Sequence, residues 1–347
     1  MNLASSELSL GAQTSYAELF DMAKTIEATR FAALRGSFHQ RQLKGNTYIY
    51  FNFRDTDGRT RSAYVGPDGP RTQQLIGAFE SEMVAERLER LARRAQACMA
   101  LGCAVVPGKD IKIIQKLASY GLFRGGGVLI GSHGFTALSN MLGVRWETRH
   151  GLRGNHSAPA GRHISIALPD GFELPEQDTI ASLEIGQLPI REFSGLTSEA
   201  HRNPASPGVQ IDLVSSEGTS DAVQASAPRI RIRQCEFVDF SVQGAVQGVV
   251  FGKTGASLVN LPDPARFAAQ QLIFSGAESA GESIEPRREL EQAAALVAWH
   301  SEQNRTGHFG KAWREALQRG PEWRERGQIA SRALLRLHPQ LAHAFAG

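Results

Sequence analysis

The residues best suited to chemistry lie around a glycine-rich turn near the middle of the chain. Gly125 to Gly127 lead into the apolar run Val128 to Ile130, which ends at Gly131-Ser132. Beyond this turn, apolar side chains recur at helical spacing at Phe135, Leu138, Met141 and Leu142. This pattern predicts a buried strand that turns sharply into a helix. Backbone N–H groups and the positive end of a helix dipole would meet at such a turn, which suits a phosphate chain.

The turn does not carry the signature of an ATPase phosphate loop. Gly131-Ser132 is not followed by the Gly-Lys-Ser/Thr sequence that a Walker motif requires, so that class is excluded. Two further segments carry polar groups in strand-like runs, His163 to Ala167 and Val209 to Val214. Positions two apart in a strand face the same side, so His163 and Ser165 would share one face.

Four segments of the chain resemble a bacterial family of nucleotidyltransferase-fold proteins, within the polymerase-beta-like nucleotidyltransferase superfamily. They are Lys44 to Tyr50, Leu122 to Trp146, Ile211 to Leu213 and Leu261 to Phe267. In that superfamily a strand ending in Gly-Ser leads into a helix. A strand with two alternating acidic residues follows, and a later strand carries a third acid.

The resemblance implies an α+β fold around a mixed sheet, in which the strands Val128–Ile130, His163–Ala167 and Val209–Val214 are adjacent. It implies that Gly131 and Ser132 bind the nucleotide and that Asp212 is the third carboxylate. It also shows a departure, because His163 and Ser165 stand where the family has Asp-x-Asp.

Histidine and serine are poor substitutes for the two missing carboxylates. Mg²⁺ prefers hard anionic oxygens, whereas imidazole suits zinc, copper, iron or nickel. A second departure is Gln271, which stands where the resembling helix carries a lysine. The sequence therefore predicts a degenerate metal site, with His163 and Ser165 as its altered positions and with the identity of any bound metal left open.

Two functions follow from this departure. The favoured one is a binding module, a nucleotidyltransferase fold that has lost catalysis and binds a nucleotide, a nucleic acid or a partner protein. The alternative is an active enzyme that moves a nucleotide from an NTP to a protein or nucleic acid. The active enzyme would need Mg²⁺ held by Asp212 and another acid such as Asp170 or Asp178, whereas the binding module needs no cofactor.

A zinc site is a third and weaker interpretation. It would use His150, His156 and His163, but their separations match no standard zinc spacing. The three cysteines, Cys98, Cys103 and Cys235, lack Cys-x-x-Cys spacing and are expected to be buried thiols.

Composition is that of an ordinary globular protein, with 41% hydrophobic and 21% charged residues. The net charge of +3 is too small to require a nucleic-acid partner. No run of eighteen apolar residues and no signal-peptide pattern is present, so we expect a cytoplasmic protein without a membrane partner.

The pattern of elements predicts three parts. Residues 1–105 would form a helix, a basic β-hairpin and a long helix; residues 106–262 would form the nucleotidyltransferase-like core; and residues 263–347 would form a helical bundle. The hairpin would pair Thr47–Phe53 with Arg59–Val65 through the turn dipeptide Asp57-Gly58. The expected long helix runs from Pro70 to about Ala100. Further short strands are expected at Ala181–Ile185, Leu188–Phe193, Arg229–Phe237, Ala245–Phe251 and Ser257–Leu261.

Basic residues flank the aromatic hairpin, among them Arg54, Arg59 and Arg61. Basic residues around aromatic strands can bind nucleic-acid backbones, so these arginines are candidate nucleic-acid contacts. The simpler interpretation is a charged solvent face on a ribbon packed against a helix.

Overall fold

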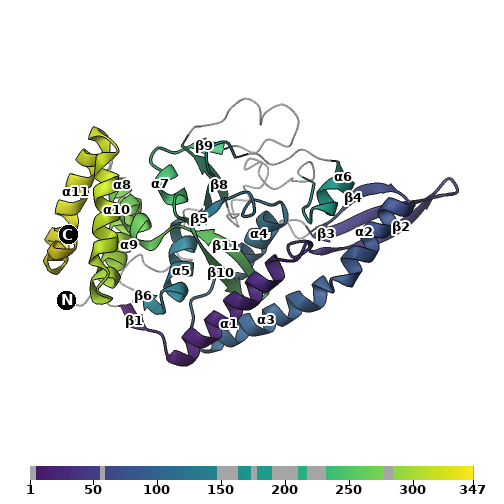
Figure 1. Ribbon diagram of the computed structural model, residues 1–347, viewed down its shortest axis with the longest axis horizontal. Coiled ribbons are helices and arrows are strands. Elements are labelled where there is room, and N and C mark those ends of the chain that lie inside the picture. Colours follow the sequence, from purple (N-terminus) through teal and green to yellow (C-terminus); the bar gives the residue numbers. More distant parts are fainter. Residues whose placement is uncertain are drawn as a thin grey trace.

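The structure is a computed structural model that describes residues 5–54, 59–146, 163–172, 178–189, 210–216, 232–276 and 284–346. A six-stranded sheet lies at the centre, a three-stranded sheet projects from one end, and the C-terminal helices lie at the other end (Figure 1). The strands are β1 (Ser5–Glu7), β2 (Gly36–Leu43), β3 (Asn46–Arg54), β4 (Thr60–Pro67), β5 (Val128–Ile130), β6 (Val144–Trp146), β7 (His163–Ala167), β8 (Gln210–Ser215), β9 (Ile232–Gln234), β10 (Val246–Gly252) and β11 (Gly255–Leu261).

Helices pack against the central sheet and against the three-stranded sheet, and β1 pairs with β6 in a small two-stranded sheet. The helices are α1 (Leu10–Glu27), α2 (Pro70–Ser81), α3 (Val84–Ala100), α4 (Gly108–Ser119), α5 (Gly131–Met141), α6 (Thr179–Glu184), α7 (Asp239–Val242), α8 (Pro264–Ser275), α9 (Ile284–Glu302), α10 (Thr306–Gln318), α11 (Pro321–Leu337) and the 3-10 helix η3 (Pro339–Phe345). The predicted α+β fold class is therefore confirmed. Within the described residues, no helix is long and apolar enough to cross a membrane.

The central sheet is mixed, in the order β10-β11-β5-β7-β8-β9. β10–β11 and β5–β7 are antiparallel pairs, whereas β11–β5, β7–β8 and β8–β9 are parallel. The predicted adjacency of β5, β7 and β8 is confirmed. β5 can lie inside the sheet because Val128 and Leu129 are fully buried, and Ile164 and Ile166 of β7 are buried beside them.

Helices from the N-terminal part pack directly on this sheet. Both α1 and α3 contact β10 and β11, and the Tyr16 hydroxyl of α1 accepts from the Val249 backbone N–H at 3.1 Å. Burial raises the pKa of the Tyr16 hydroxyl to about 12. Cys98 and Cys103 are buried in the same region, and Cys235 is half-buried.

The N-terminal module differs from the predicted hairpin, because β2 adds a third strand to β3 and β4. Lys44 and Gly45 make the two-residue turn between β2 and β3, with φ of 52° and 81°. Two positive φ values at the central positions are typical of a type I′ turn. The Asp57-Gly58 dipeptide lies outside the described residues.

The predicted long helix is also divided. Met83, with φ of 50°, separates α2 from α3, because a left-handed residue cannot continue an α-helix.

Two strand predictions are wrong: one segment is a helix, and the other forms a shorter strand than predicted. Ala181–Ile185 lies largely within helix α6, which begins where the Asp178 side chain accepts from the Ala181 backbone N–H at 2.8 Å. Of Arg229–Phe237, only Ile232–Gln234 forms a strand among the described residues. Leu188 belongs to no strand, and most of the run predicted with it lies outside the described residues. The predicted strands at β10 and β11 are confirmed.

The C-terminal helices pack around α8. α9, α10 and α11 all contact α8, and its side chains Phe267, Leu272 and Ile273 are buried. The predicted helical bundle is confirmed, and α8 connects it to the sheet because β11 leads directly into α8.

Candidate functional site

Strand register brings the predicted site residues to one edge of the central sheet. Ile130 at the end of β5 lies opposite Ser165 of β7, and Ser165 lies opposite Asp212 of β8. Gly131 follows Ile130, so the turn, Ser165 and Asp212 stand side by side. Residues separated by more than eighty positions in the sequence thus meet at the place where β5 ends and β7 begins.

The turn itself depends on a glycine. Gly131 has φ of +65°, in the left-handed region, and a Cβ atom there would lie 3.9 Å from the Ser165 Cβ. α5 begins at Gly131, and no side chain caps its N-terminus. The backbone N–H groups of its first turn, including that of Ser132, are therefore directed toward the sheet edge, where they could bind an anion.

His163 and Asp212 are in direct contact at this edge. His163 Nδ1 donates a hydrogen bond to Asp212 Oδ2 at 2.7 Å, since a carboxylate can only accept. The His163 side chain is 41% exposed and the Asp212 side chain is 14% exposed. The carboxylate is thus largely covered, and the imidazole of the first residue of β7 is hydrogen-bonded to it.

A second His–Asp pair, which sequence reasoning missed, joins the first turn of α5 to α4. His133, the residue after Ser132, is buried, and its Nε2 lies 3.1 Å from Oδ2 of Asp110 in the first turn of α4. Asp110 is 1% exposed. This contact fixes the first turn of α5 against α4. A signal was available, since Asp110 is the only acidic residue of α4 and lies in its first turn.

The acids considered as replacements lie elsewhere. Asp170 follows the far end of β7 and accepts from the Ser216 hydroxyl at 2.5 Å. Asp178 caps α6. Neither accompanies Asp212. His150 and His156 lie outside the described residues, within which His, Cys, Asp and Glu form no group of three or more that could hold a metal ion.

Gln271 lies inside the helical bundle. It is 4% exposed, and its Nε2 donates to Gln292 Oε1 of α9 at 2.6 Å. The side chain joins α8 to α9 inside the helical bundle.

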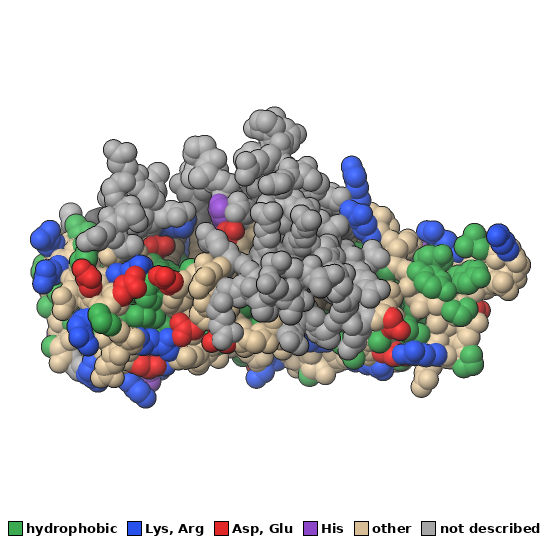
Figure 2. Space-filling model, turned by 90° about the horizontal axis from the view of Figure 1, so that it is seen from above, with side chains coloured by type: hydrophobic (Ala, Val, Ile, Leu, Met, Phe, Trp, Pro, Cys, Tyr) green, Lys and Arg blue, Asp and Glu red, His purple; other side chains and the backbone are tan. Residues whose placement is uncertain are grey.

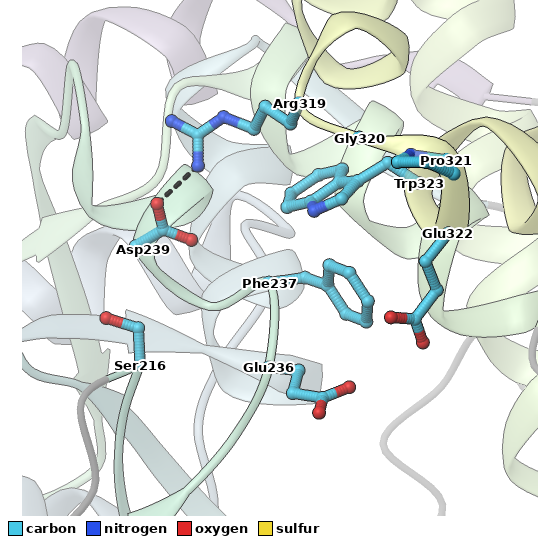
Figure 3. A pocket seen from close by; sticks show the side chains of 9 residues that line it. All are labelled: Ser216, Glu236, Phe237, Asp239, Arg319, Gly320, Pro321, Glu322 and Trp323. Atoms are coloured by element: carbon cyan, nitrogen blue, oxygen red, sulfur yellow. Dashed lines mark hydrogen bonds and ion pairs between the residues drawn. The ribbon is translucent and has the colours of Figure 1, made fainter.

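A pocket of about 540 Å³ lies at the opposite end of β8, between the core and the α10–α11 turn. Figure 3 shows the Trp323 and Phe237 rings on one wall, the Glu236 and Glu322 carboxylates below them, and Arg319 paired with Asp239 at the side. Of the predicted site residues, none lines it. Its acidic rim would repel phosphate, so the pocket does not serve the chemistry that the β5–α5 turn suggests.

The three arginines predicted as nucleic-acid contacts do not share one face. Arg54 lies on the outer face of the three-stranded sheet, two residues beyond Asn52. Arg61 lies opposite Phe53, whose side chain enters the core, and Arg59 precedes β4.

Comparison with known proteins finds one family. The model of a family described as "Nucleotidyltransferase" matches residues 109–318, which is more than half of the chain and contains β5, β7, β8 and the turn between β5 and α5. Neither the curated proteins nor the solved structures contain a significant match.

Proposed function

The chain belongs to this nucleotidyltransferase family, and on that premise we propose that it is a catalytically degenerate member, which binds a nucleotide at the Gly131-Ser132 turn without transferring it. Its further partner would be a nucleic acid or a protein.

The contact between His163 and Asp212 is the observation that supports loss of catalysis. Nucleotidyl transfer depends on metal ions that neutralise charge developing on the phosphates. The described donors at this edge are one imidazole, one strand hydroxyl at Ser165 and one carboxylate, and that carboxylate already accepts from the imidazole. Such a set does not fit a pair of Mg²⁺ ions, which need several anionic oxygens.

The features that remain are those of an anion site. The first turn of α5 offers backbone donors, and the His163 ring lies at the edge where the phosphates would be placed. Backbone donors and a helix dipole bind phosphate without any metal, although less tightly than a complete metal site. Binding without turnover is therefore the expected behaviour.

The experiment measures binding and transfer separately. Purified protein would be titrated with each NTP by calorimetry, then incubated with each labelled NTP, Mg²⁺ or Mn²⁺, and cell extract as the source of acceptors. We expect binding and no labelled product. Gly131→Ala should weaken binding, whereas Asp170→Asn, at the other end of β7, should leave it unchanged.

The same assay tests the alternative, an active metal-dependent nucleotidyltransferase, which is favoured by the retention of Asp212 on β8 beside β7. Labelled product from the unmutated protein that disappears in Asp212→Ala would establish the alternative and contradict degeneracy. The double substitution His163→Asp, Ser165→Asp restores the family pattern. Product from this variant alone would show that the two altered positions are what removed catalysis.

A further inference from the structure

The outer face of the three-stranded sheet carries an aromatic and basic surface at the end of the molecule. We define the tyrosine face as the side chains of Arg41, Tyr48, Tyr50, Arg54 and Tyr64. We propose that the tyrosine face binds single-stranded nucleic acid, with bases stacked on the tyrosine rings and phosphates paired with the arginines. This inference specifies the further partner of the proposed function but does not depend on nucleotide binding at the Gly131-Ser132 turn, because the face lies in residues 36–67, outside the family match at residues 109–318.

The register of the sheet brings the three tyrosines together. Tyr50 lies opposite Tyr64 across β3 and β4, and Tyr48 lies two residues before Tyr50 on the same face. The Tyr50 and Tyr64 ring centroids are 5.5 Å apart, and those of Tyr48 and Tyr64 are 6.1 Å apart. The rings are edge-on or tilted to one another, so they form a row and not a closed stack. Ring faces in such a row remain available to flat ligands.

Cationic groups border the rings. The Arg41 guanidinium lies 4.7 Å from the centroid of the Tyr50 ring, and Arg41 pairs with Tyr48 in the β2–β3 register. Arg54 extends the same face by two residues beyond Asn52, and Lys44 stands in the exposed β2–β3 turn. A guanidinium on an aromatic face can contact a base by stacking and a phosphate by hydrogen bonding.

Opposite sides of the sheet have different roles. On the inner face, Phe51 and Phe53 are buried, and the Phe51 ring meets Phe79 edge-on at 5.8 Å. On the outer face, Tyr64 is 48% exposed, and Tyr48 and Tyr50 are half-buried. The inner phenylalanines hold the sheet to the core, so the outer tyrosines are not needed for that packing.

The charge of this face is complementary to a polyanion. On this face, β2 contributes Arg41 and β3 contributes Arg54, and none of β2, β3 and β4 contains an aspartate or glutamate. Asp68, which follows β4, accepts from the Gln73 side chain on α2. Figure 2 shows hydrophobic and basic side chains gathered at the end of the molecule that the three-stranded sheet forms.

The combination of exposed tyrosine rings with arginines favours single-stranded nucleic acid over a duplex. Phosphates would satisfy the arginines in either case, but only unpaired bases expose their faces for stacking on tyrosine rings. Acidic polymers without bases could pair with the arginines and would leave the tyrosines unused. The proposal therefore predicts an oligonucleotide affinity that depends on both the arginines and the tyrosines.

The test measures binding of fluorescein-labelled oligo(U) and oligo(dT), about twelve nucleotides long, by fluorescence anisotropy at low and moderate salt. We expect both oligonucleotides to bind. Tyr64→Ala should weaken binding at least about fivefold, and Tyr50→Ala combined with Tyr64→Ala at least about twentyfold. The double substitution to phenylalanine keeps the rings and should stay within about twofold. Arg41→Gln should reduce the slope of log affinity against log salt by about one.

The control is Arg93→Gln, which removes one exposed arginine from α3 and should leave the affinity unchanged. Thermal unfolding by circular dichroism checks that each variant is folded. Preference for oligo(U) over oligo(dT) would support the proposal and add recognition of the 2′-hydroxyl. The proposal is overturned if neither oligonucleotide binds at low salt, if the folded double alanine variant binds as the unmutated protein does, or if polyphosphate competes as well as the oligonucleotides.

Discussion

His163 Nδ1 and Asp212 Oδ2 lie 2.7 Å apart, joining the first residue of β7 to the middle of β8. The imidazole N–H donates to the carboxylate at the edge where the α5 turn begins. Without this hydrogen bond, the Asp212 carboxylate would repel any phosphate chain bound at that turn more strongly, because both groups are anions.

The first prediction is a double-mutant cycle at this pair. His163→Ala should weaken NTP binding about tenfold, because it removes the imidazole N–H from the Asp212 carboxylate at the edge where the phosphates would lie. Asp212→Asn in the same chain should restore most of the affinity, which corresponds to a coupling energy of about 1 kcal/mol. Calorimetric titration with ATP and GTP would measure all four proteins. Additive effects of the two substitutions would show that the pair does not act on the nucleotide.

The second prediction compares two glycines of the turn. Gly131→Ala places a side chain at φ of +65°, which should lower the free energy of unfolding by about 1–2 kcal/mol. Gly134→Ala should cost more, about 3 kcal/mol, because its Cβ would lie 2.5 Å from the Leu129 carbonyl oxygen and push α5 away from β5. Urea unfolding followed by fluorescence would measure both.

A matched control exists for these alanine substitutions. Gly77 lies inside α2, and a Cβ there would meet nothing within 4 Å. Gly77→Ala should therefore be neutral or stabilising by up to about 1 kcal/mol. Equal effects at the three glycines would contradict the role assigned to the turn.

The sequence predicts the β5–α5 unit and the central strands because their signals are local. An apolar run bounded by glycines, followed by helical spacing, describes β5 and α5 without any tertiary information. β2 carried no such signal, since Phe38 is its main inward apolar residue and its outer positions are polar. The segment of α6 favours a strand in the sequence because a short apolar run fits a strand or a helix equally well, and only the cap at Asp178 distinguishes the two.

The side-chain contacts of the candidate site could not be predicted from the sequence, because they depend on tertiary packing. His163 and Asp212 are separated by 49 positions, and their contact follows from the β7–β8 register, which no local pattern fixes. His133 and Asp110 meet through the packing of α5 against α4. The direction of Gln271 likewise depends on where α9 lies. Residue types could be proposed from the sequence, whereas their partners could not.

The third prediction concerns Arg319, which joins the end of α10 to α7. Its guanidinium pairs with Asp239, donates to Gln243 Oε1 at 2.8 Å, and lies 4.9 Å from the centroid of the Phe240 ring. Arg319→Ala removes all three contacts and should lower the free energy of unfolding by about 2–3 kcal/mol.

Arg319→Lys tests the same contacts in a second way. It keeps the charge but loses the planar fork, so it should recover only part of the lost stability. Arg324→Ala, at an exposed position of α11, is the control and should change the stability by less than about 0.5 kcal/mol in the same urea titration. An effect of Arg319→Ala no larger than that of the control would show that α7 and α10 are held together by packing alone.

The last prediction is a loss of stability in mild acid caused by His300 of α9. This side chain is 4% exposed, and neither ring nitrogen has a hydrogen-bond partner among the described residues. Burial lowers the pKa of His300 to about 4, opposed by the Asp263 carboxylate and assisted by His308 and Arg305.

The direction of this pH effect follows from the protonation of His300 in the folded and unfolded chains. In the unfolded chain the imidazole has a pKa near its ordinary value of 6.5, so between pH 6.5 and 4 the unfolded state binds a proton that the folded state does not. Protonation therefore favours unfolding, and the stability present above pH 6.5 falls by up to roughly 3 kcal/mol as the pH approaches 4.

Urea unfolding of the unmutated protein and of His300→Leu at several pH values would isolate this effect. The leucine variant should show a shallower decline over that window, whereas His39→Gln, on the exposed β2 strand, should decline as the unmutated protein does. Parallel curves for the unmutated protein and His300→Leu would mean that His300 does not titrate as a buried neutral ring.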